Sequence, residues 1–94
     1  MRLPNEKETY RMEKFHAYIE LHADDHIIAR EDAYSPSQYG AKVSAFDKTK
    51  ELVKTLADGT QVYVYIDIEN AAGHYVTHSN IYGTVRGGEL EFAY

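Results

Sequence analysis

The chain has 94 residues, a net charge of −5 with neutral histidines, nine tyrosines and no cysteine. This length has room for one hydrophobic core, so residues 1–94 are expected to form a single domain. The lack of cysteine excludes disulfides, thiolate zinc sites and cysteine nucleophiles. Because no apolar run could cross a bilayer and no secretory signal is recognisable, a cytoplasmic protein without membrane contact is the default expectation.

Residues 1–10 are polar and are expected to form a loose lead-in. From Phe15 to Ala23, apolar and polar residues alternate, which predicts a strand with one buried face. A helix is the competing interpretation, because apolar residues also recur every fourth position, but Leu21 would then leave the apolar stripe. Asp24 and Asp25 predict a turn, and residues 26–30 predict a second strand.

Residues 31–43 have the composition of a loop, and the tyrosines at positions 34 and 39 are expected to pack over the edge of the core. The next segment, Ser44–Asp58, predicts a helix with Ser44 as its N-cap and Gly59 as its stop. The apolar stripe of this helix is expected to comprise Phe46, Leu52, Val53, Leu56 and Ala57.

The segment from Val62 to Glu69 alternates valine and isoleucine with tyrosine and acids, which predicts a half-buried strand. Asn70–Gly73 predicts a four-residue connection to the next strand. The expected cross-strand pairs are Glu69 with His74, Asp67 with Val76, Tyr65 with His78, and Val62 with Ile81.

Gly87 and Gly88 predict a two-residue turn, because positive φ angles cost glycine little. The turn pairs Val85 with Leu90, Gly83 with Phe92, and Ile81 with Tyr94, and it lets the Phe92 ring cover the gap at Gly83. The predicted order is β-β-α-β-β-β. The expected fold class is therefore α+β, with two layers and one helix on a mostly antiparallel sheet of four or five strands.

The face of this sheet away from the helix is expected to carry tyrosine, histidine and carboxylate side chains. If the first strand joins in the same sense, its even-numbered residues from His16 to His22 lie there too. Tyrosine combines a large rigid contact area with a polar tip, so it is common at protein interfaces, although tyrosines can also simply stack across strands. The candidate partner-binding residues are Tyr18, Tyr63, Tyr65, Asp67, Glu69, His74, His78, Tyr82, Glu89 and Glu91.

A metal site and an active site on the same face are the alternatives. His74 and His78 are about 13 Å apart along a strand, too far to share one ion, so a metal would need His74 with Glu69 or His78 with Asp67. Proton transfer by His78, Tyr65 and Asp67 would need a concave pocket, which a flat sheet face does not supply. No catalytic motif, metal site or cofactor is therefore predicted.

The negative charge opposes direct binding of nucleic acid. Residues 55–94 hold five carboxylates and one arginine, which indicates either ordinary solubility charge or an acidic face for a basic partner. We expect a non-catalytic module that binds a basic, nucleic-acid-binding protein and inhibits it by mimicking nucleic acid. In size and acidity it compares with small phage-encoded inhibitors, an analogy of composition only. A homodimer through this face, or through the strand Leu90–Tyr94, is a third possibility.

Overall fold

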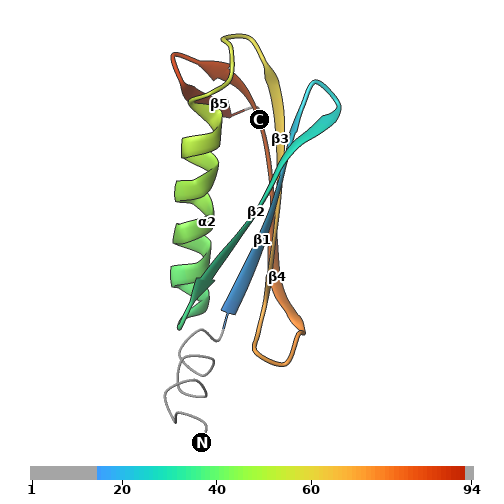
Figure 1. Cartoon of the computed structure of the whole chain (residues 1–94), viewed down its shortest axis with the longest axis vertical. Helices are drawn as coiled ribbons and strands as arrows, with labels where there is room; N and C mark the ends of the chain where they lie inside the picture. The colour runs from blue at the N-terminus through green and yellow to red at the C-terminus, as the bar shows by residue number, and fades with distance from the viewer. Residues whose placement is uncertain (1–14, 93–94) are drawn as a thin grey trace, which may run out of the picture.

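The computed structural model describes residues 15–92 and shows one helix packed on a five-stranded antiparallel sheet (Figure 1). The expected α+β fold and element order are confirmed. The order of strands across the sheet is β2-β1-β3-β4-β5. Their bounds are β1 Phe15–Ala23, β2 His26–Ser35, α2 Gln38–Val53, β3 Gln61–Glu69, β4 Tyr75–Arg86 and β5 Glu89–Phe92. The predicted lead-in at residues 1–10 lies outside the described residues.

The hydrophobic core lies between α2 and the sheet, and most of its strand residues come from β1 and β3. Alternate residues on both strands are buried, as the period-two pattern predicts for a sheet with one covered face. Leu21 is fully buried in β1, so the strand prediction is confirmed and the competing helix is wrong. The buried side chains of the two strands are Ala17, Ile19, Leu21, Ala23, Val62, Val64, Ile66 and Ile68.

Helix α2 starts six residues before the predicted position and ends at Val53, five residues earlier than predicted. It buries a narrow stripe of small side chains, whereas Phe46, Leu52 and Leu56 are only partly buried around the core. Small residues let the helix axis approach the sheet closely. The expected apolar stripe is confirmed at Val53 and, at the margin of the core, at Phe46, Leu52 and Leu56, whereas Ala57 is exposed. The buried helix residues are Ala41, Ala45, Thr49 and Val53.

Ser37, and not Ser44, caps the helix, since its Oγ accepts a hydrogen bond from the Gly40 amide at 2.9 Å. Gly40 lies in the first turn of α2, where a larger residue would not fit, because a Cβ at that position would collide with the Ser35 side chain. Residues 31–35 extend β2, and residues 38–43 are helical. The predicted loop at 31–43 is therefore wrong, because its Ser, Pro and Gly residues mark a helix start.

The β3–β4 pairing differs from the predicted register by two residues. Asp67 lies opposite His78, Tyr65 opposite Asn80 and Val62 opposite Gly83. The connection is one residue longer than predicted, Asn70–His74, and a register shift between Ile68 and Glu69 places Glu69 opposite Tyr75. An even shift leaves every residue beyond the irregularity on its predicted face. Ile81, Gly83 and Val85 therefore lie on the helix side, in agreement with the predicted alternation, although the predicted partners are wrong.

The β4–β5 hairpin has the predicted register, with Val85 opposite Leu90 and Gly83 opposite Phe92. Gly87 and Gly88 both have positive φ, as a two-residue turn requires. The atoms nearest to a Cβ built at Gly83 belong to Leu90 and Glu91, not to Phe92. The predicted pair of Ile81 with Tyr94 falls outside the described residues. Within residues 15–92, no helix is both long and apolar enough to cross a membrane.

Candidate functional site

The sheet face away from α2, called the open face below, carries most of the predicted binding residues. Tyr18, Tyr63, Tyr65, Asp67, Glu69, His78, Tyr82 and Glu91 lie there by strand register. His74 lies in the β3–β4 turn, so its predicted place on a strand is wrong. Glu89 pairs with Arg86 at the margin but also borders a cleft on the helix side. The other charged and aromatic members of the open face are His16, Glu20, His22, Arg30, Asp32, Tyr34 and Arg86.

Three rings form an aromatic stack across β1, β3 and β4. Tyr63 and Tyr82 lie opposite each other with centroids 4.7 Å apart and planes 12° apart. The His22 ring lies 5.4 Å from Tyr63 on the other side. Burial, with the adjacent Tyr82 hydroxyl, raises the pKa of Tyr63. Below, His22, Tyr63 and Tyr82 are called the Tyr63 stack.

A hollow of 690 Å³ opens beside the Tyr63 stack, at the β1–β2 turn. Asp24 and Asp25 border it and hold positive φ angles of 49° and 69°. Asp24 is fixed to β3, because its amide donates to the Gln61 carbonyl at 3.0 Å. The hollow therefore combines aromatic rings with two carboxylates, and the expectation that this face supplies no concave pocket is wrong at this end. The remaining lining residues are Val62 and Gly83.

Glu20 organises the centre of the open face as a shared acceptor. It accepts hydrogen bonds from the Tyr18 hydroxyl at 2.9 Å and from His22 Nε2 at 2.8 Å. Arg30 Nε lies 3.5 Å from the same carboxylate. The hydrogen bonds from Tyr18 and His22 lower the pKa of Glu20, so this carboxylate keeps its negative charge. Glu20 also connects the Tyr63 stack to the edge strand β2.

His16 forms a second cluster near the other end of β1. Its Nδ1 lies 2.9 Å from Glu69 and its Nε2 lies 2.6 Å from Asp32, while its ring stacks on Tyr34 at 4.7 Å. Both ring nitrogens thus face carboxylates, an arrangement that only the protonated imidazole satisfies with two donors. Burial lowers the pKa of His16, but the hydrogen bonds to Glu69 and Asp32 outweigh it and raise the pKa above 6.5.

The His16 cluster predicts a pH-dependent stability. A raised folded-state pKa means that the contribution of His16 is complete below about pH 6.5 and is lost as the pH rises through the folded value. We expect the free energy of unfolding of the wild type to exceed that of His16→Gln by about 1–2 kcal/mol at pH 6 and by clearly less at pH 9. Urea unfolding of both proteins at the two pH values measures this difference, and a difference that grows with pH would contradict the assignment.

The sequence predicts a loop at Asp32 and Tyr34, and it predicts that Tyr34 and Tyr39 pack over the edge of the core. The second prediction is wrong, because Tyr34 stacks on His16 on the open face and Tyr39 is 77 % exposed. The alternation of Asp32 and Tyr34 with Ala33 continues the pattern of β2 and could have extended the predicted strand to Ser35.

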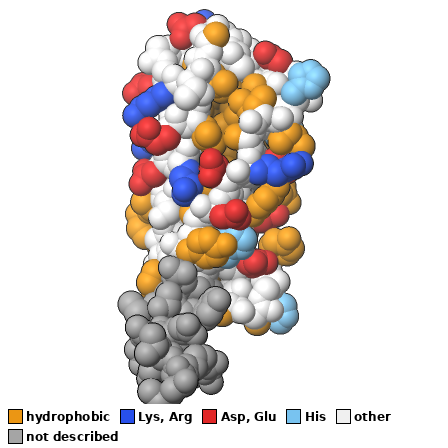
Figure 2. All heavy atoms as spheres, viewed as in Figure 1, with side chains coloured by type: hydrophobic (Ala, Val, Ile, Leu, Met, Phe, Trp, Pro, Cys, Tyr) orange, Lys and Arg blue, Asp and Glu red, His pale blue; other side chains and the backbone are white. Residues whose placement is uncertain are grey.

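The space-filling view shows acidic and basic side chains interspersed along the molecule, and hydrophobic side chains in a hollow in the upper half of the view (Figure 2). Within residues 15–92, no group of three or more His, Asp or Glu residues is arranged to hold a metal ion.

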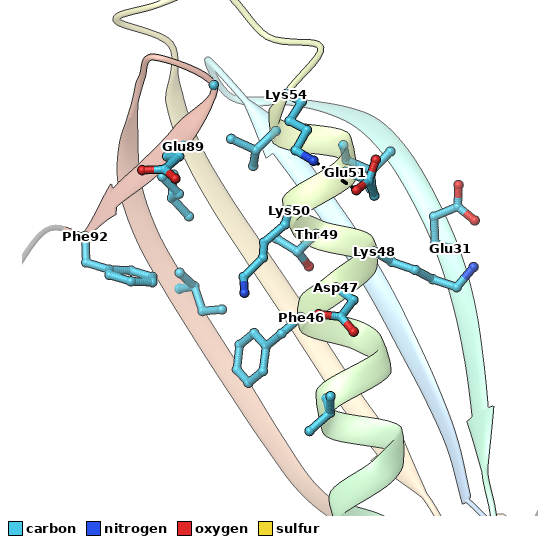
Figure 3. A pocket seen from close by; sticks show the side chains of 16 residues that line it. Glu31, Phe46, Asp47, Lys48, Thr49, Lys50, Glu51, Lys54, Glu89 and Phe92 are labelled. Atoms are coloured by element: carbon cyan, nitrogen blue, oxygen red, sulfur yellow. Dashed lines mark hydrogen bonds and ion pairs between the residues drawn. The ribbon is translucent and has the colours of Figure 1, made fainter.

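A larger cleft of 1240 Å³ lies on the helix side of the sheet. Figure 3 shows Phe46 and Lys50 extending from α2 toward the side where β5 carries Phe92 and Glu89. Partly buried Ile81 and Leu90 also line the cleft. This arrangement arises because α2 packs mainly over β1 and β2 and leaves the β4–β5 end of the same face less covered. Acidic and basic residues both line the cleft, and Lys54 pairs with Glu51 at 3.1 Å.

The comparisons with known proteins identify no relative. No protein-family model, curated protein or solved structure matches the chain. The function is therefore argued from the side chains of the open face.

Proposed function

We propose that this protein is a non-catalytic binding module whose open face engages a basic surface of another protein. The observation that carries the proposal is the hollow where the Tyr63 stack meets Asp24 and Asp25. Aromatic faces attract cations, and carboxylates pair with them, so the hollow suits an arginine or lysine side chain of the partner. A partner whose basic groove binds nucleic acid would be inhibited by this occupation.

The charge of the open face supports a basic partner. Its carboxylates are Glu20, Asp32, Asp67, Glu69 and Glu91, and its arginines are Arg30 and Arg86. This excess of negative charge would speed the encounter with a positive surface and repel a phosphate backbone. Hydrogen bonds to Glu20 hold Tyr18 and His22 in place, and stacking holds Tyr63 and Tyr82, so these side chains lose less conformational entropy on binding.

Titration with an arginine-rich peptide tests the proposal. We expect the backbone amide NMR signals of the hollow, from His22, Asp25, Gln61 and Tyr82, to shift first, and an acidic peptide of equal length to shift none of them. Asp25→Asn should weaken peptide binding by about tenfold, the effect of one lost charge-assisted contact. Glu51→Gln, an exposed acid on α2, is the matched control. Shifts spread over the whole surface, or equal effects of the two variants, would contradict a specific site.

A further inference from the structure

Among the described residues, β2 is the longer of the two edge strands of the sheet. β2 has ten residues, and among residues 15–92 it pairs only with β1. Lysine, proline, shortness, bulges and inward-pointing charges all protect natural edge strands. β2 contains no lysine or proline, although its pairing with β1 is irregular at Ile28 and its Glu31 faces the helix side. The other edge, β5, comprises only four described residues. Ile27, Ile28 and Tyr34 of β2 are 44 %, 46 % and 54 % exposed, so the edge also carries apolar surface.

We propose that β2 pairs antiparallel with β2 of a second copy, centred on Glu31, to form one continuous ten-stranded sheet. In a dimer with a twofold axis perpendicular to the sheet, directly opposite residues of the two β2 strands lie on the same face. The axis must therefore pass beside a residue that pairs with its own copy, and not between two residues. Centring on Arg30 or on Asp32 would place two like charges opposite each other on the open face. Centring on Glu31 instead places Arg30 opposite Asp32 of the second copy, twice.

The charges of one copy are already arranged for this register. Arg30 lies near Glu20, at 3.5 Å, and Asp32 is bound to His16 at 2.6 Å. The Arg30 and Asp32 side chains are 61 % and 55 % exposed, so both remain accessible to a second copy. Directly opposite residues have Cβ atoms about 5 Å apart, within reach of an ion pair. The two existing pairs would then join into a chain of alternating charges across the interface.

Counted along β2, Ile28 would meet Tyr34 of the second copy on each side of the charged centre, although Ile28 itself has no partner on β1 at the irregularity in the strand pairing. On the opposite face, the two Glu31 residues meet at the axis, which costs roughly 0.2–1 kcal/mol. Figure 3 shows the Lys48 side chain extending from α2 toward Glu31, where it offsets part of that repulsion. The symmetry places both copies of α2 on one side of the sheet.

Single cysteines test the register, since the natural chain has none. Cα atoms of opposite residues lie about 4.5–5.5 Å apart in an antiparallel pair, within the range of a disulfide. We expect Glu31→Cys to form a covalent dimer under mild oxidation about tenfold faster than Lys42→Cys, an exposed helix position. Ile28→Cys and Tyr34→Cys should cross-link poorly alone but readily when mixed.

The remaining outcomes overturn the proposal. Equal cross-linking of Glu31→Cys and Lys42→Cys, or a monomer mass for the wild type in sedimentation up to about 100 µM, would show that β2 does not pair. Efficient cross-linking of Glu91→Cys but not Glu31→Cys would assign the interface to β5 instead. Circular dichroism of each variant shows that the fold is retained, so a negative result reflects the interface and not unfolding.

Discussion

Alanine at both Tyr63 and Tyr82 is expected to weaken binding of the basic partner by at least about 100-fold. Removal of aromatic side chains from the centre of an interface typically costs 2 kcal/mol or more, and each 1.4 kcal/mol is a factor of ten. The two rings form one stack, so their loss removes both the cation-binding surface and one wall of the hollow. Calorimetric titration with the arginine-rich peptide measures the loss.

Tyr39→Ala is the matched control, because Tyr39 is 77 % exposed but lies on α2, away from the open face. It should bind as tightly as the wild type. Phenylalanine at positions 63 and 82 separates the two features of tyrosine, since it retains the stack but removes the hydrogen bond from the Tyr63 hydroxyl to Asn80. If the double alanine variant binds normally while its circular dichroism is unchanged, the open face is not the binding surface.

The sequence predicts the sheet correctly where the signal is local, that is, where apolar and polar residues alternate within one strand or where turn residues follow one another. The alternation in β1 and β3 identifies the buried face because each strand needs only its own residues for that pattern. The turns at Asp24–Asp25 and Gly87–Gly88 are marked by residues that tolerate positive φ. These two kinds of signal sufficed for the fold class and for the face on which the tyrosines lie.

The start of α2 and the β3–β4 partners could not be predicted, because each depends on contacts with distant residues. Ser37 and Ser44 both suit an N-cap, and packing of Ala41 and Ala45 against the sheet selects the earlier start. The irregularity at Glu69 is stabilised by the turn, where Asn70 Oδ1 accepts hydrogen bonds from the amides of Ala72 and His74. A pattern of alternation is unchanged by a two-residue shift, so it contains no information about this choice.

The candidate site was only partly visible for the same reason. His16, Asp32 and Glu69 come from three strands, and their contact depends on β1 lying between β2 and β3. Nothing in the spacing of residues 16, 32 and 69 indicates that order. The hollow likewise forms only because the β1–β2 turn lies beside Gln61 at the start of β3.

Ile19→Ala is expected to produce the largest loss of stability. Ile19 is fully buried on an inner strand, opposite Ile66, and the substitution leaves a cavity under α2. Such changes cost about 2–5 kcal/mol, a large part of the roughly 5–15 kcal/mol that stabilises a typical domain. For a chain of this length, the melting temperature should fall by about 10–25 °C.

The matched control is Ile27→Ala, which removes the same atoms from a side chain that is 44 % exposed and should cost less than about 1 kcal/mol. Urea unfolding in dilute solution compares the two variants without a contribution from self-association. The midpoint should fall for Ile19→Ala with little change in slope, because the same surface is exposed on unfolding. Equal losses for Ile19→Ala and Ile27→Ala would contradict a core built between β1, β3 and α2, since only the first side chain belongs to it.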